Sequence, residues 1–479
     1  MYEPTTNILI IIVIVAYFLL LALIAFVTGR SRTDSQFFTG HRRSSWVVVA
    51  IGMIGSSVSG ISLVSVPGMV VGSGFTYLQT VMGFVVGYAV VALVLLPLYF
   101  KRNLVSIYGY LELRFGRQAH RTGAWFFIVS KTITSATKLY IAVLVLQRFV
   151  FEAYGIPISV TVTLFVLMIW LYTFRGGIGT IVWTDALQTV VLFAAIFLML
   201  LQVTKSLNLS FTDAFRVIND APMSRIFVFD WISDRNFFKQ FFSGVFIVIV
   251  MTGLSQDMVQ STLSCKNIRE AQKNMFWYGA AFLPFNLLLL SLGALLLVYA
   301  GQHGFALPEK PDEIVPLFAS GLLGKAVYFC FIIGIIAATF NSADSALTAI
   351  VTSVYVDILK KDRETKPSFW HRNVLYLTIC ASFILIVLVF VNLDNRSIID
   401  TLYTIVGYAY GPLLGLFAFG LLSRRQINDR LTPFIALASP VFTYLIDVTC
   451  RHFFQYQFGY ELLMLNGMIT LIGLTAIKK

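Results

Sequence analysis

Apolar runs of roughly twenty residues, long enough to cross a bilayer as an α-helix, recur from one end of this 479-residue chain to the other. Inside a bilayer the backbone must satisfy its own hydrogen bonds, which a helix does. Charged residues make up 12% of the chain, against about 25% in soluble proteins. The chain is therefore predicted to be an all-α polytopic membrane protein. A soluble enzyme, a disordered chain and a coiled coil are excluded.

We expect about thirteen transmembrane helices, because that many segments approach the length of a span. They lie near residues 7–28, 46–71, 76–100, 122–150, 157–174, 178–204, 237–255, 276–301, 325–357, 373–393, 398–421, 431–449 and 458–477. The first run follows a short start without a basic region or a cleavage site of small residues. It is therefore predicted to be a retained helix and not a signal peptide.

The net charge of +12 would suggest nucleic-acid binding in a soluble domain, but here the basic residues follow the membrane topology. Most Lys and Arg gather in alternate connections, chiefly 30–43, 101–121 and 360–372. Such connections stay on the cytoplasmic side. We therefore predict an outside N-terminus and a cytoplasmic C-terminus. The lipid bilayer is the expected partner, and neither nucleic acid nor an obligate protein partner is expected. The compact chain suggests that this membrane is a bacterial inner (plasma) membrane.

No sequence motif indicates an enzyme. The four Cys residues lack metal-ligand spacing. The segment Gly176-Gly177-Ile178-Gly179 has no following phosphate-binding Lys, and no Ser/His/Asp set can be argued. Because an ATPase motif is missing as well, any uphill transport by this chain must draw on an ion gradient.

The helix expected at 46–71 contains an unusual density of small and polar residues. Between Gly55 and Ser62 it reads GSSVSGIS, and Pro67-Gly68 follows. Gly and Ser could simply permit close helix packing. Their density together favours an unwound segment, whose free carbonyls are tolerated at membrane depth only where they line a cavity or hold an ion.

The helix expected at 325–357 carries a second polar stretch. Ala338, Asn341, Ser342 and Ser345 share one helix face by their spacing. Small oxygen-bearing side chains on one face suit sodium, which prefers oxygen ligands, although a polar helix–helix contact would also use them. Asp344 flanks that face, and a carboxylate at this depth indicates function by default.

Three further ionisable residues lie within spans. Asp185 either pairs near the membrane interface or faces the helix at 325–357 and adds negative charge to a cation site. Lys131 and Lys138 share one face of the helix at 122–150. Lys131 is expected to snorkel toward the cytoplasm. Lys138 lies deeper, where it would neutralise Asp185 or Asp344, or meet an anionic solute.

These motifs resemble those of the sodium/solute symporter family, which includes sodium-coupled sugar, proline and sialic acid transporters. The resemblance covers nearly the whole chain. Its most specific parts are Ser59-Gly60 to Pro67-Gly68, Tyr110-Leu111-Glu112-Leu113-Arg114-Phe115-Gly116, Gly176-Gly177 to Trp183-Thr184-Asp185-Ala186-Leu187-Gln188, Gln256-Asp257-Met258-Val259-Gln260, and Asn341-Ser342-Ala343-Asp344-Ser345-Ala346.

The resemblance implies the five-plus-five inverted repeat of the leucine-transporter type. Residues 1–45 would then hold an extra N-terminal helix and an inside connection. Residues 46–204 would form the first repeat, residues 205–421 the second repeat with its outside loops, and residues 422–479 two extra helices.

The resemblance also implies a main sodium site between the two polar helices. Carried over to this sequence, its ligands are the carbonyls of Gly55 and Val58, the carbonyl of Ala338, and the side chains of Asn341 and Ser342. Asn341 stands where the family has a hydroxyl residue, and its amide oxygen can still ligate sodium.

A second sodium site occurs in some family members. Its matches here are Asp185, Asn341, Asp344 and Ser345. Asp344 stands where a hydroxyl is found in sialic acid transporters that resemble this chain. Two carboxylates in one site would either bind sodium or share a proton, because like charges raise one pKa.

The resemblance places the solute among Ser57, Ser59, Ser62, Gln79, Lys138, Phe242 and Tyr403. The sequence is thus read as a symporter that couples inward sodium movement to uptake of a small polar solute. The polar residues suit a sugar, and Lys138 favours an acidic sugar such as sialic acid or another carboxylate. A proton-coupled carrier, a transporter-like receptor and a channel remain as alternatives.

Overall fold

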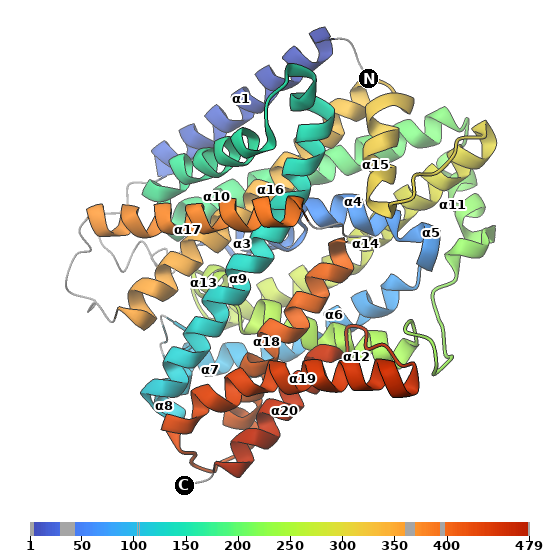
Figure 1. The fold of residues 1–479 in the computed structure, drawn as a ribbon. Helices are drawn as coiled ribbons and strands as arrows, with labels where there is room; N and C mark the ends of the chain where they lie inside the picture. The colour runs from blue at the N-terminus through green and yellow to red at the C-terminus, as the bar shows by residue number, and fades with distance from the viewer. Residues whose placement is uncertain are drawn as a thin grey trace.

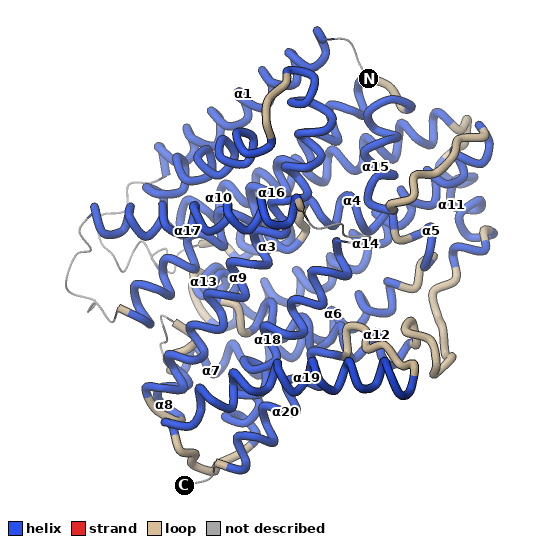
Figure 2. Tube along the Cα trace, in the orientation of Figure 1, coloured by secondary structure: helices blue, strands red, loops and turns tan. Residues whose placement is uncertain are grey.

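The computed structural model describes residues 4–28, 44–102, 104, 106–359, 369–392 and 398–477, and these are almost entirely helical (Figures 1 and 2). No β-strand occurs within these ranges, where a single isolated bridge joins Ser44 to Cys265. The basic connections at 30–43 and 360–372, on which the predicted orientation partly rests, lie largely outside the described residues.

Among the described residues, the longer helices are joined by connections that include the long segments 207–236 and 304–324. In chain order they are α1 (Pro4–Thr28), α3 (Trp46–Ser57), α4 (Gly60–Gly68), α6 (Tyr77–Val90), α9 (Arg117–Leu146), α10 (Ile158–Ser206), α12 (Phe237–Val248), α13 (Gln256–Leu263), α14 (Ile268–His303), α16 (Lys325–Ser353), α17 (Phe369–Val391), α18 (Ile398–Leu422), α19 (Thr432–Phe454) and α20 (Leu462–Ala476). Short helices between them include α5 (Val70–Ser73), α7 (Leu96–Lys101), α8 (Gly109–Arg114), α11 (Phe211–Asp220) and α15 (Ile314–Leu317).

These helices account for the predicted spans. Within the described residues, 9 helices are long and apolar enough to cross a membrane, or up to 11 when each of two bent pairs is counted as one span. Two shorter apolar helices, Ile158–Thr173 and Leu462–Ala476, fall where the remaining spans were predicted. The predicted all-α polytopic architecture is thus confirmed.

The backbone of α10 stays helical through residues 174–180, where we predicted a short inside connection. The described part of α10 contains one candidate span, Ile181–Ser206, and a shorter apolar stretch, Ile158–Thr173. Tyr172 hydrogen-bonds Asp344, and Asp185 hydrogen-bonds Ser345, the residue after Asp344. The segments on both sides of residues 174–180 therefore contact neighbouring residues of α16.

Burial separates central helices from peripheral ones. In the most apolar stretch of α9 and in that of α16, 78% of the residues are buried, against 22% for α1 and 28% for α19. Figure 1 shows α1 along one edge and α19 with α20 along the opposite edge, while α3, α4, α9 and α16 cross the middle. The polar helices of the sequence therefore lie at the centre, away from lipid.

Two spans are broken near their middles. α3 meets the segment Gly60–Ser73, which contains α4 and α5, at an angle of 59°, and the segment Phe237–Gly253 meets α13 at 65°. The first break was predicted from its glycines and serines. The second was not, because the span was expected to end near residue 255, whereas α13 continues it and is buried throughout. Interrupted helices at corresponding positions of two halves are typical of transporters built from inverted repeats.

Candidate functional site: a broken helix, a polar cluster and a cavity

The break in the first span consists of Val58 and Ser59, which both have extended backbone conformations. The last helical hydrogen bond of α3 runs from Val58 N to Ile54 O, at 2.9 Å. The carbonyls that follow have no partner within α3, because a helix leaves its final carbonyls unpaired. The predicted unwinding thus occurs at the expected place and frees carbonyl oxygens at Gly55 to Val58.

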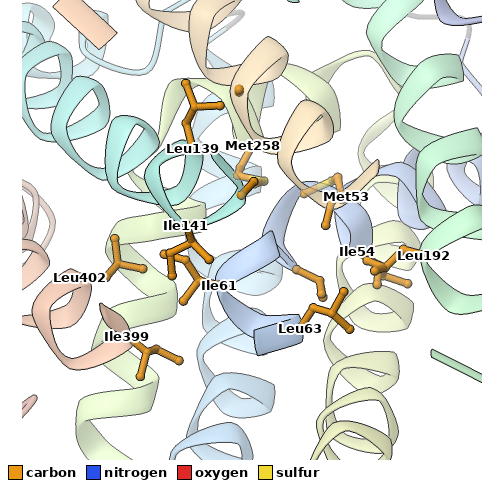
Figure 3. Packing of buried hydrophobic residues seen from close by; sticks show 14 of the residues in the cluster. Met53, Ile54, Ile61, Leu63, Leu139, Ile141, Leu192, Met258, Ile399 and Leu402 are labelled. Atoms are coloured by element: carbon orange, nitrogen blue, oxygen red, sulfur yellow. The ribbon is translucent and has the colours of Figure 1, made fainter. Parts of the chain in front are cut away.

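Apolar side chains hold the two arms of the break in place. Figure 3 shows Met53 and Ile54 on α3 and Ile61 and Leu63 on α4, with Leu192 of α10 beside Ile54. All five side chains are buried. The free carbonyls between the two arms are therefore fixed by packing on both sides.

Glycine lets the broken helix approach its neighbours closely. A Cβ atom on Gly55 would overlap Thr189 Oγ1 of α10 and Asn341 Nδ2 of α16. One on Gly60 would lie 2.8 Å from Thr339 Oγ1 of α16. Any larger residue at these positions would push α3 or α4 away from the polar face of α16.

The predicted polar face of α16 meets the break. Ser342 Oγ donates a hydrogen bond to Ser56 O at 3.0 Å. Asn341 Oδ1 accepts from Ser56 Oγ at 2.5 Å, and Asn341 Nδ2 donates to Asp185 O at 3.0 Å. Ala338 is buried on the same helix. The structure therefore brings the α3 end of the break together with the residues proposed as ligands of the main sodium site.

Asp185 is buried in the same cluster. Its Oδ2 accepts from Ser56 Oγ at 2.9 Å and from Ser345 Oγ at 3.0 Å. Its Oδ1 is buried and has no hydrogen-bond partner among the described residues. The single hydroxyl hydrogen of Ser56 also faces the acceptors Asn341 Oδ1 and Gly52 O.

The cluster thus holds more acceptors than donors. Such an excess of oxygen acceptors around a buried carboxylate fits a bound cation, because unpaired buried acceptors are costly. Hard cations prefer oxygen ligands of this kind. The residues present therefore suit sodium on chemical grounds.

Asp344 is buried beside this cluster but has its own partners. Its Oδ2 accepts from Tyr172 OH at 2.8 Å, and its Oδ1 accepts from the backbone N–H of Ser345 at 2.6 Å. Ser345 links the two carboxylates, since its hydroxyl bonds Asp185. The structure thus gathers the proposed second-site residues and adds Tyr172, which the sequence interpretation missed.

A cavity that is partly open to solvent lies on the other side of the break. Five of the seven predicted solute residues line it, namely Ser57, Ser59, Ser62, Lys138 and Tyr403. Ser57 also hydrogen-bonds Tyr278. The cavity and the ion cluster therefore share the residues of one broken helix.

Two predicted solute residues lie elsewhere. The Gln79 amide donates to Arg235 O at 3.0 Å and accepts from Val228 N at 3.1 Å, so Gln79 holds the 205–236 loop against α6. Phe242 is 49% exposed on α12 and does not line the cavity. The residue type and the helix were not enough to predict that a side chain lines the cavity, because the rotation of the helix about its axis decides which face meets the cavity.

Lys131 does not snorkel to the cytoplasm as expected. Its ammonium forms an ion pair of 2.5 Å with Asp257 Oδ2 of α13, and both side chains are buried. Asp257 Oδ1 accepts from Ser255 Oγ at 2.5 Å. Lys131 also lines the cavity, so the pair joins the second broken span to α9 at the cavity wall.

Aromatic residues complete the cavity and were not identified from sequence. They are Tyr77, Phe84, Tyr88 and Phe282. Tyr77 OH lies 3.0 Å from Tyr403 OH, and Tyr88 OH donates to Tyr278 OH at 2.9 Å. The tyrosines could have been identified from the sequence as polar residues within spans, since a buried tyrosine hydroxyl requires a hydrogen-bond partner.

The chain is similar to known sodium-coupled symporters. The profile of the sodium:solute symporter family matches residues 37–430. The chain is 26% identical over 457 residues to the sodium/sialic acid symporter NanT of Aliivibrio fischeri, covering 93% of this chain and 89% of NanT. It is 25% identical over 419 residues to the sodium/sialic acid symporter SiaT of Proteus mirabilis, covering 83% and 81%.

Solved structures share the fold. A substrate-bound, outward-open Na⁺-coupled sialic acid symporter superposes with a TM-score of 0.83 at 20% sequence identity, covering 99% of each chain. Mhp1, a nucleobase-cation-symport-1 family transporter, superposes with a TM-score of 0.57 at 15% identity, covering 91% of this chain and 93% of Mhp1.

The chain has the all-helical membrane-protein fold of the leucine-transporter type, as predicted. The chain belongs to the sodium:solute symporter family. Sodium-coupled solute transport is the activity that this membership carries.

Proposed function

We propose that this protein takes up a small acidic solute, an acidic sugar or another carboxylate, by coupling it to inward sodium movement. The observation that carries this proposal is the Lys138 ammonium. It lines the cavity beside the helix break, and no hydrogen bond or ion pair to it occurs among the described residues. Because an uncompensated charge at membrane depth is costly, a solute carboxylate that pairs with Lys138 would be bound strongly.

The remaining polar wall suits the hydroxyl groups of a sugar. Ser57, Ser59 and Ser62 come from the broken helix, and Tyr403 faces them from α18. The relatives NanT and SiaT are named for sialic acid, which is a sugar with one carboxylate. Their likeness to this chain supports an acidic sugar as the first solute to test.

Sodium would couple to this solute through the broken helix. A sodium ion bound among Gly55, Val58, Ala338, Asn341 and Ser342 would hold α3 against α16 and so complete the solute wall. Its loss to the cytoplasm would loosen that contact and favour the inward-open state, which is coupling through differential affinity. One charge moving through 100 mV yields about 2.3 kcal/mol. A second sodium at Asp185, Asp344 and Ser345 would add to this driving force.

The membrane arrangement follows from the sequence pattern. We place the N-terminus outside and the C-terminus in the cytoplasm, because basic residues concentrate in the alternate connections that would then face inward. We place residues 46–204 and 205–421 in the two repeats, each of which opens with one of the broken spans. A bacterial inner membrane is the proposed location, since NanT and SiaT are bacterial.

A second candidate function is proton coupling, which one observation favours. Asp344 accepts from Tyr172 and contacts no Lys or Arg in the described structure. A proton on Asp344 would remove the repulsion between Asp344 and Asp185. Asp344→Asn would then flatten the pH dependence of uptake, whereas a sodium ligand at this position would instead lower sodium affinity.

The proposed function is tested by uptake into proteoliposomes with a panel of solutes. The panel contains N-acetylneuraminate, gluconate, pyruvate, proline and glucose, each measured with sodium and with potassium in its place. We expect sodium-dependent uptake confined to the carboxylates that carry no ammonium group. Uptake of glucose or proline in preference to every other member would contradict the proposed role of Lys138.

A further inference from the structure

Among the described residues, the cavity is lined by two charged side chains, Lys131 and Lys138. Both belong to α9, and seven residues separate them, so they lie on one face about 10 Å apart along the helix. Their surroundings differ. Lys131 is paired with Asp257 at 2.5 Å, whereas Lys138 has no such partner in the described part of the chain.

Asp257 is held in place on both of its oxygens. Oδ2 accepts from Lys131, and Oδ1 accepts from Ser255 at the start of α13. The turn before α13 is itself fixed, because Gln256 Oε1 accepts from Ile107 N at 3.1 Å and Leu254 O accepts from Tyr108 OH at 3.0 Å. Asp257 is therefore committed to Lys131, and its charge cancels that of Lys131 at the cavity wall.

Packing keeps this pair against the cavity. Met258, the residue after Asp257, lines the cavity and belongs to the same buried apolar cluster as Leu139 of α9, and Figure 3 shows both side chains. Other charged groups are set apart from the cavity wall. Asp185 and Asp344 belong to the ion cluster behind the break, and Asp400 is exposed and accepts from Tyr460 OH at 2.6 Å.

We propose that Asp257 sets the charge of the solute that this cavity accepts. By cancelling Lys131, it leaves one net positive charge, that of Lys138, and so selects solutes with one negative charge. A neutral solute would leave Lys138 uncompensated, and a solute with two negative charges would leave one of them uncompensated, which is costly away from water. This inference rests on the proposed function, because it requires solute binding beside Lys138.

The rival interpretation is purely structural. In that case the pair only ties α9 to α13, and breaking it lowers stability without changing which solutes are preferred. Variants that change the cavity charge separate the two interpretations. Asp257→Asn leaves Lys131 uncancelled, and the double variant Lys131→Met with Asp257→Leu removes the pair while keeping one net positive charge. Asp447→Asn is the matched control, because it breaks an ion pair with Arg451 on α19.

The test uses three six-carbon competitors that differ in charge. Glucose, gluconate and glucarate carry none, one and two negative charges at neutral pH. Each competes against sodium-dependent uptake of labelled N-acetylneuraminate in proteoliposomes. In the wild type and in the Asp447→Asn control, gluconate should compete about tenfold better than the other two, which corresponds to about 1.4 kcal/mol.

In Asp257→Asn the best competitor should become glucarate, and in the double variant it should return to gluconate. An unchanged order in Asp257→Asn, or a wild-type cavity that does not favour gluconate, overturns the charge assignment. If Asp257→Asn does not fold, Lys131→Met takes its place. That variant leaves Asp257 to cancel Lys138 and should make glucose the best competitor, and an unchanged order there overturns the charge assignment. If the wild-type protein shows no sodium-dependent uptake of any carboxylate, the proposed function itself is wrong.

Discussion

Replacing Ser342 with Ala removes one oxygen from the junction between α16 and the broken helix. In the structure, Ser342 Oγ is buried and donates to Ser56 O at 3.0 Å. A hydrogen bond to a charged group is worth about 1.5–3 kcal/mol, and we take a similar value for an oxygen that contacts sodium. Sodium affinity should therefore fall by about 10- to 150-fold.

The same substitution should change stability little. It removes one neutral hydrogen bond, worth about 1 kcal/mol, and Ala is a good helix former. Ser65→Ala is the matched control, because Ser65 is buried on α4 and its hydroxyl has no hydrogen-bond partner among the described residues. Ser65→Ala should leave sodium affinity as it is.

The assay is the sodium concentration that gives half-maximal solute uptake in proteoliposomes, together with thermal unfolding of the purified protein. We expect the Ser342→Ala variant to need much more sodium while unfolding near the wild-type temperature. A sodium requirement within twofold of wild type, in a folded and active variant, would refute the assignment of Ser342 as a ligand.

Three further substitutions test separate parts of the site. Lys138→Met should lower binding of acidic solutes at least about tenfold while sparing sodium binding, and calorimetry on both ligands measures this; equal loss of both would place Lys138 in the ion cluster. Asp185→Asn should lower the Hill coefficient for sodium toward one if Asp185 binds a second ion, or flatten the pH dependence of uptake if Asp185 shares a proton. If the variant shows neither effect, Asp185 is only a structural partner. Gly55→Ala should weaken sodium binding and cost about 1–3 kcal/mol of stability through overpacking, because the new methyl group overlaps Thr189 and Asn341; a stable variant with wild-type sodium affinity would argue against close contact here.

Much of the architecture could be predicted because bilayer thickness imposes a length on every span. The apolar runs located the helices, and the dense glycines and serines from Gly55 to Ser62 located the first break. The second break escaped prediction because Ile249 to Ser255 contains only Gly253 and Ser255 as signals. The bend falls at Leu254 and Ser255, directly after a π-helical turn at Ile249–Gly253, and ordinary residues can form such a turn.

The polar residues of α16 were identifiable because helix spacing puts them on one face. Their partners were not, since these lie far away in the sequence. Lys131 meets Asp257 across 126 positions, and Tyr172 meets Asp344 across 172. Residue type alone could not show that Lys131 is compensated and Lys138 is not, because that difference arises from where the fold places Asp257 of α13.

The central claim is that a sodium gradient alone drives accumulation of an acidic solute. Proteoliposomes with a tenfold inward sodium gradient, equal pH on both sides and a clamped membrane potential test it directly. We predict that internal N-acetylneuraminate rises above the external concentration by about tenfold for each coupled sodium ion. If the internal concentration of every carboxylate tested stops at the external value, or if accumulation follows a pH gradient without sodium, the account is contradicted.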